Sequence, residues 1–191
     1  MRLTRSCLLG LSMLLSAPLY AEVEHYKIDT SGAHAFVTFK ISHLGFSWIQ
    51  GRFNDFDGEF RFDPENPQAA YLNMTVDVGS IDTNHAERDK HLRSDDFFAV
   101  DEHPQASFVS TAYRRTDDGQ GQLEGELTIR GTTQKVTLDV QELAAGNDPW
   151  GGYRRGYSAS TTLQLEDFGL RVVSPASATA ELTVTLEGIR Q

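Results

Sequence analysis

The chain has 191 residues and a formal net charge of −10 at pH 7, from 17 Lys and Arg against 27 Asp and Glu. Nucleic-acid binding depends on basic side chains that neutralise phosphates, so this acidic composition argues against nucleic acid as a partner. A chain of this length can bury enough apolar surface to stabilise one domain by its core alone.

Residues 1–21 have the pattern of a secretory signal peptide. Arg2 and Arg5 precede an apolar run over residues 7–15, and the segment ends at the small residue Ala21. The run is too short to span a bilayer, which takes about 20 apolar residues. We therefore predict cleavage after Ala21 and a periplasmic location.

The predicted mature chain is one domain of residues 22–191. Removal of the signal leaves 15 basic residues against 27 acidic ones, a formal charge of −12. Cys7, the single cysteine, lies in the signal, so the mature domain has no disulfide to stabilise it. No later segment is apolar for long enough to cross a membrane, and we predict no integral membrane anchor.

The first half of the mature chain alternates apolar and polar residues, which predicts β-strands. In the segment 34–42, Val37, Phe39 and Ile41 share one face. The same alternation continues over residues 56–63 and 71–78. Seven of the 11 Phe residues fall between positions 36 and 62, so these strands place many rings on the apolar side.

Residues 84–94 break the strand pattern and predict a short helix. Asn84 can cap the first turn while Glu87 returns the bond in a capping box, and Asp89 lies four residues before Arg93. The segment has almost no apolar face, so it needs support from the rest of the fold. We expect the aromatic pair at 97–98 to anchor it as a lid across one end of the β-structure.

The second half of the chain returns to period-two alternation. The predicted strands cover residues 106–113, 122–130, 134–143, 157–165 and 179–188. Turn-forming residues separate neighbouring strands at 63–67, 117–119, 130–131 and 146–149. Successive strands with short turns and one apolar face predict an all-β fold, a closed antiparallel β-barrel of about eight strands. Such a barrel is either filled by side chains or encloses one small ligand, and composition alone favours the filled interior.

Two site hypotheses follow from residue types alone. His85, Glu87, Asp89 and His91 are potential metal ligands, but the helical periodicity separates them onto two sides, so we predict no metal and no cofactor. A second hypothesis is a secreted serine-type hydrolase, a small protease, that uses Asp29, His34 and Ser47 as a triad. Ser47 lies in a strand-like stretch without a nucleophile-elbow motif, so binding without catalysis is the preferred prediction.

Three separated motifs resemble the YceI-like family of periplasmic proteins. They occur in order at residues 83–97, at Leu127-Thr128-Ile129-Arg130-Gly131-Thr132-Thr133 and at Asp148-Pro149-Trp150-Gly151-Gly152. The resemblance runs from about Tyr26 to Gly188. It implies a lipocalin-like barrel that holds a polyisoprenoid or similar long-chain lipid, and it suggests a homodimer.

The resemblance favours a hollow barrel over a filled one and makes the apolar strand faces the predicted ligand-binding wall. This wall comprises Phe39, Phe60, Phe62, Met74, Phe108, Leu127 and Val184. In the lid, His85, Arg88 and Arg93 are candidates for a polar contact to a lipid headgroup. Trp150, on a glycine-flanked loop, is a candidate to fold over the barrel rim.

Overall fold

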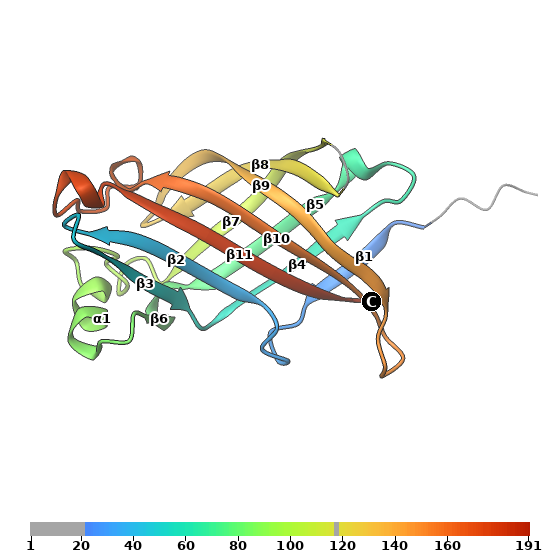
Figure 1. Cartoon of the computed structure of the whole chain (residues 1–191), viewed down its shortest axis with the longest axis horizontal. Coiled ribbons are helices and arrows are strands. Elements are labelled where there is room, and N and C mark those ends of the chain that lie inside the picture. The colour runs from blue at the N-terminus through green and yellow to red at the C-terminus, as the bar shows by residue number, and fades with distance from the viewer. Residues whose placement is uncertain (1–21, 117–118) are drawn as a thin grey trace, which may run out of the picture.

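The computed structural model describes residues 22–116 and 119–191, so the predicted signal peptide lies outside the described residues. Within the described residues the strands form one antiparallel sheet in the order β1-β4-β5-β7-β8-β9-β10-β11-β2-β3-β6. Pairing of β1 with β11 closes eight of these strands into a barrel (Figure 1). The predicted all-β, lipocalin-like barrel with a short helix is confirmed.

The described strands are β1 (Glu24–Ile28), β2 (Phe36–His43), β3 (Ser47–Phe53), β4 (Phe56–Phe62), β5 (Tyr71–Asp77), β6 (Ile81–Asp82), β7 (Gln105–Arg115), β8 (Gln120–Ile129), β9 (Thr132–Asn147), β10 (Tyr153–Gln164) and β11 (Thr179–Arg190). The α-helix is α1 (Ala86–Arg93). Short 3-10 helices are η1 (Pro67–Ala69), η2 (Val78–Ser80), η3 (Leu165–Phe168) and η4 (Pro175–Ser177). Each predicted strand segment overlaps one of these strands, and five of the segments run one or two residues past a strand end. No strand range was predicted for β1, β3 or β6, although the stretch around Ser47 was recognised as strand-like.

The long strand β11 makes the two ends of the barrel different. Its last residues pair with β1, while its first part, from Ala180 to Thr185, pairs with β2. The hairpin of β2 and β3 therefore extends the wall at one end, together with α1 and η4 (Figure 1). We call this the α1 end. On its outer side β3 pairs with β6 only through Arg52 and Phe53, so among the described residues 47–51 have no strand neighbour there.

Aromatic rings lie flat on glycines of the neighbouring strand inside the barrel. A Cβ atom added at Gly51 would meet the Phe39 ring at 2.3 Å, and one added at Gly125 would meet the Phe108 ring at 2.4 Å. Each ring thus occupies the space that a side chain on the paired strand would take. Glycine is otherwise unfavourable in a strand, and a covering aromatic ring compensates for it.

The start of α1 differs from the prediction. Asn84 has a positive φ of 60°, and His85 is the cap, with its Nδ1 accepting the N–H of Arg88 at 3.2 Å. The predicted capping box of Asn84 and Glu87 is therefore wrong. Asn and Asp are the residues that best tolerate the left-handed region, so Asn84 serves the turn before the helix rather than the cap.

Candidate functional site

The α1 end of the barrel encloses an apolar cavity of about 450 Å³, the upper cavity. Its wall comes from both sides of the barrel and includes Phe39, Phe53, Phe98, Leu127, Leu163 and Leu182. A volume of this size lies within the range of small-molecule sites, roughly 300–1,000 Å³. The interior is therefore hollow at this end.

Helix α1 covers the upper cavity, and hydrogen bonds to backbone carbonyls hold it there. Arg93 donates from Nε to the Gly79 carbonyl at 2.7 Å and from Nη2 to the Ile81 carbonyl at 2.8 Å. Arg88 donates to the Thr83 carbonyl at 2.7 Å. Because Arg93 is used in this way, the predicted helical pair with Asp89 is wrong.

Asp89 stabilises the same segment from inside the helix. This carboxylate is buried and accepts hydrogen bonds from the Thr83 backbone N–H at 2.9 Å and from the Thr83 hydroxyl. Buried carboxylates need such donors, because an unpaired buried charge is strongly unfavourable. Phe97 and Phe98 both line the upper cavity, so the predicted aromatic anchors of the lid are confirmed.

The upper cavity adjoins an open cleft of about 470 Å³ outside the barrel, between the free edge of β3 and the loop that leads into α1. His43, Ile49, Thr83 and Arg88 line both spaces. We call this junction the portal. Arg88 is partly exposed here, so a predicted headgroup contact from this residue is geometrically possible. His85, by contrast, is exposed and borders neither space.

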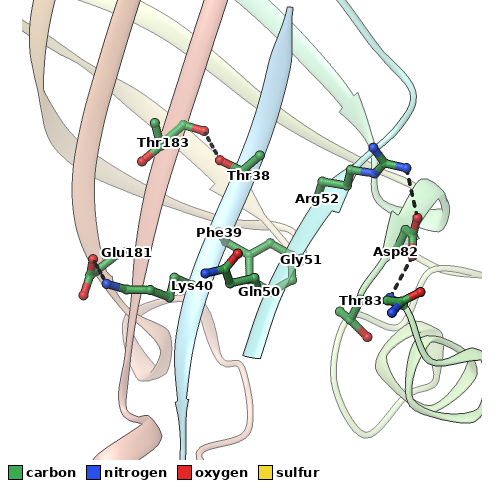
Figure 2. A pocket seen from close by; sticks show the side chains of 11 residues that line it. Thr38, Phe39, Lys40, Gln50, Gly51, Arg52, Asp82, Thr83, Glu181 and Thr183 are labelled. Atoms are coloured by element: carbon green, nitrogen blue, oxygen red, sulfur yellow. Dashed lines mark hydrogen bonds and ion pairs between the residues drawn. The ribbon is translucent and has the colours of Figure 1, made fainter. Parts of the chain in front are cut away.

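A second groove, of about 620 Å³, lies on the outer surface of β2 and β3 (Figure 2). Its charged side chains already pair with each other: Lys40 with Glu181 at 2.8 Å and Arg52 with Asp82 at 3.3 Å. These exposed pairs are solvated and occupy each other. Each charged side chain drawn in Figure 2 therefore already has a partner, and none of them indicates a ligand.

The opposite end of the barrel contains a smaller lower cavity of about 60 Å³. Three predicted wall residues line it, namely Phe60, Phe62 and Val184. Of the other predicted wall residues, Phe39 and Leu127 line the upper cavity. The predicted wall is thus divided between two separate spaces in the described structure.

A packed layer, the middle layer, separates the two cavities. On β5, Val76 lines the upper cavity and Leu72 the lower one, while Met74 between them lines neither and is buried. The same order of upper, middle and lower positions occurs on β7 as Ala106, Phe108 and Tyr113, and on β8 as Leu127, Gly125 and Leu123. Met74 and Phe108, predicted as ligand-binding wall, form the partition instead.

A buried arginine lies next to the lower cavity. Arg155 donates to Glu142 at 2.7 Å and to Glu24 at 3.0 Å, and its guanidinium lies 3.9 Å from the centre of the Phe62 ring. Burial raises the pKa of the Glu24 carboxyl, but hydrogen bonds from Tyr26 and Arg155 outweigh this effect, so its pKa is lowered. Arg155 was not predicted from the sequence, although it lies two residues before Tyr157 in β10 and so faces the same side of the strand.

Trp150 lies far from the lid. Its loop joins β9 to β10 at the end opposite α1 (Figure 1). The ring is 78% exposed, and the Arg154 guanidinium is 5.5 Å from its centre. The predicted role of Trp150 in folding over the barrel rim is therefore wrong for the rim that opens to the upper cavity.

The predicted hydrolase triad is not assembled. Asp29 and His34 lie before β2, and Ser47 lies after it, opposite His43. The eight residues of β2 separate the two groups by about 25 Å at about 3.3 Å per residue. A nucleophile must be within hydrogen-bond reach of its base, so the serine hydrolase hypothesis is wrong for these residues.

Asp29 instead belongs to an ion-pair cluster at the end opposite α1. Among the described residues, Asp29, His34 and Glu187 are near enough to share a metal ion. The guanidinium of Arg154 already lies between the carboxylates, 2.7 Å from Asp29 and paired with Glu187. A cation would have to displace this arginine, so the cluster is an ion-pair network.

The cluster predicts a stability change in acid. The Arg154 hydrogen bond, with the Gly32 N–H, lowers the pKa of Asp29 from 3.8 to about 2. A lowered folded-state pKa contributes stability above pH 3.8 that is lost as the pH falls towards 2. We expect Asp29→Asn to cost about 1–2 kcal/mol at pH 7 and to flatten the fall in unfolding free energy between these pH values. Urea denaturation at several pH values measures the unfolding free energy of the native chain, of Asp29→Asn and of the exposed control Asp101→Asn. The same dependence of unfolding free energy on pH in all three proteins would contradict the prediction.

The sequence comparison decides the family. A family model described as the YceI-like domain matches residues 26–188. The chain belongs to the YceI-like family. A UPF0312 protein of Pseudomonas paraeruginosa is 50% identical over 184 residues, which are 96% of this chain and 96% of that protein.

Solved structures of YceI-like proteins have the same architecture. The crystal structure of a Campylobacter jejuni YceI protein matches with a TM-score of 0.71 at 28% identity, and the match covers 80% of this chain and 91% of that one. A polyisoprenoid binding domain from Saccharophagus degradans matches with a TM-score of 0.63 over 87% of this chain and 98% of that one. At 16% identity, the second likeness concerns the fold alone. No helix in the described part of this YceI-like chain is long and apolar enough to cross a membrane.

Proposed function

We propose that this YceI-like protein binds and carries a polyisoprenoid or a similar long-chain lipid, with the apolar tail inside the barrel. The observation that carries the proposal is the upper cavity of about 450 Å³, which is lined mostly by apolar side chains and adjoins an outer cleft at the portal. Such a space favours an aliphatic chain over a polar ligand. Placing an apolar tail against apolar walls removes both surfaces from water, whereas a polar ligand would lose its hydrogen bonds to water there.

The energetics suit a ligand with few polar contacts. Each methylene removed from water contributes about 0.8 kcal/mol, although ordering the chain offsets part of the gain. Arg88 is the one predicted headgroup residue at the portal, and its guanidinium already donates to Thr83 at 2.7 Å. Binding would therefore select ligands by tail length and shape more than by headgroup.

Family membership supports a binding role over an enzymatic one. The Saccharophagus degradans structure is that of a polyisoprenoid binding domain, and its barrel has the fold of this chain. Within the described residues the triad tested above is dispersed, so no observation favours hydrolysis. We extend lipid binding from that protein to this one as part of the proposal.

The proposed place of action is the periplasm, after removal of the predicted signal peptide at Ala21. A carrier in a compartment between two membranes needs no anchor of its own. The homodimer implied by the resemblance stays a prediction, which sedimentation velocity of residues 22–191 tests.

Lipid extraction tests the proposed function. The protein should be purified from the periplasm of its own host without detergent and examined by native mass spectrometry. We expect an added mass in stoichiometric amount that extraction with organic solvent identifies as a long-chain lipid. Recovery of the bare mature chain alone, with no gain in mass after incubation with farnesol or a longer prenol, would refute lipid binding.

A further inference from the structure

Large apolar side chains are exposed at the end of the barrel that opens. Phe46 is 88% exposed and Trp48 is 56% exposed, and Leu44 and Val173 beside them are exposed as well. We call these four residues the tip patch. Surface aromatics in a contiguous group usually mark an interaction site, because exposing apolar rings to water is unfavourable unless a partner covers them.

The tip patch is built on an ordered turn. The hairpin of β2 and β3 reverses at Leu44 and Gly45, which have positive φ angles of 55° and 85°. The Phe46 N–H donates to the His43 carbonyl at 2.9 Å, and the Gly45 N–H donates to the Ser42 hydroxyl at 3.1 Å. The turn therefore orders the backbone at Phe46, and the side chain of this residue lies on the outside.

Two chain segments combine in this surface. A Cβ atom added at Gly45 would lie 3.9 Å from the Cβ of Ala176 in η4, so the hairpin tip contacts the loop that carries Val173. Both segments lie with α1 at the same end of the barrel (Figure 1). The tip patch is thus a surface of the assembled fold rather than of one loop.

The tip patch is continuous with the opening of the upper cavity. Leu44 and Val173 line that cavity, and Trp48 borders the outer cleft of the portal together with Ile49 and Arg88. An apolar path therefore leads from the exposed rings to the interior. A lipid tail could follow it without crossing open water, which would cost about 0.8 kcal/mol per methylene.

The basic side chains of the segments that build the tip patch each lie beside an acidic one from a neighbouring segment. Lys40 is 2.8 Å from Glu181, and Arg171 is 3.9 Å from Asp96. The Lys40 ammonium also lies 4.4 Å from the centre of the Trp48 ring. Exposed aromatic rings at the end of a fold, flanked by solvated charges, suit the interface of a bilayer.

We propose that the tip patch docks onto a lipid bilayer and thereby aligns the portal with the membrane, so that a lipid enters the upper cavity directly. This deepens the proposed function and rests on it, because the docked surface would supply or receive the carried lipid. Phe46 and Trp48 would insert at headgroup depth. Lys40 and Arg171, which pair with Glu181 and Asp96, would lie at the rim of the docked surface.

Flotation with vesicles of phosphatidylcholine and phosphatidylglycerol in equal amounts tests the docking of the mature chain. We expect the native protein to float with the vesicles and the double variant Phe46→Ser, Trp48→Ser to bind about tenfold or more weakly. Trp150→Ser is the matched control, because it removes an equally exposed ring from the opposite end. The control should float like the native chain.

A second measurement separates docking from ligand binding. Affinity for farnesol in solution, followed by quenching of intrinsic fluorescence, should stay within about twofold for Phe46→Ser, which keeps both Trp residues. Equal flotation of the native chain and the double variant would overturn the docking proposal even if farnesol binds. A shift from dimer to monomer in the double variant, with no flotation of the native chain, would assign the tip patch to a second copy and also overturn it. Absence of farnesol binding to the native chain would instead refute the proposed function.

Discussion

Replacing Arg155 by Met should destabilise the mature protein by about 3–5 kcal/mol, one of the largest effects expected for a single substitution here. The guanidinium is buried and bridges Glu142 and Glu24, which lie on strands far apart in the sequence. Its removal would leave Glu142 without this cation, whereas Glu24 would keep Arg190 at 3.2 Å. The expected loss comes from breaking the ion pairs of a buried guanidinium and leaving a half-buried carboxylate unpaired.

An exposed arginine provides the matched control for this substitution. Arg114 pairs with Glu124 at 3.0 Å, and both side chains are largely solvated. Arg114→Met should therefore change the unfolding free energy by less than about 1 kcal/mol. Urea denaturation followed by circular dichroism measures both variants at pH 7. Similar losses of unfolding free energy in the two variants would show that burial does not determine how much the Arg155 ion pairs contribute to stability.

The barrel could be predicted from the sequence because the alternation of apolar and polar residues in its strands is a local pattern. Alternation such as that of Val37, Phe39 and Ile41 needs only one buried and one solvated face, and the structure places these residues in β2 as expected. The helix was predicted in the right place because its polar residues interrupt the strand alternation, although the capping box and the Asp89–Arg93 pair that were expected to stabilise it are wrong. Its cap could not be predicted, because the positive φ of Asn84 depends on the turn from β6 that places it.

The division of the interior could not be predicted from strand faces. Alternation identifies Met74 and Phe108 as inward-facing, but it does not give the height at which each side chain sits or whether rings meet across the barrel. The Phe108 ring packs over Gly125 on β8, so its position depends on a register between two strands. Register is a tertiary property, and a shift of one residue would have placed these side chains elsewhere.

The portal was missed for a related reason. His43 and Ile49 become an opening only because the edge of β3 lacks a strand partner among the described residues at that point. The sequence does contain a signal at the apolar tip. Phe46 and Trp48 lie at even positions, so along a strand they face the opposite side from Ile49. Rings on the polar face of a strand indicate a contact beyond the domain's own core.

Replacing Phe108 by Ala should join the two cavities and change which lipid lengths the protein prefers. In the native chain the middle layer stops a tail that enters through the portal, so affinity for prenols should rise from geraniol to farnesol and then level off. In Phe108→Ala the space beside Gly125 opens towards the lower cavity. We expect affinity to rise further, about tenfold, for geranylgeraniol, because the added methylenes are buried and ordering offsets only part of the gain.

The same variant should lose about 3–5 kcal/mol of stability, since a buried ring is removed from a packed layer. Phe108→Leu keeps more of the packing and provides a milder version if the alanine variant unfolds. Phe98→Ala is the matched control, because Phe98 lines the upper cavity and its loss enlarges that space without breaching the middle layer. Titration of the three prenols by calorimetry in each variant measures the length dependence. If Phe108→Ala and Phe98→Ala show the same profile, the middle layer does not limit tail length, and the cavity alone determines affinity.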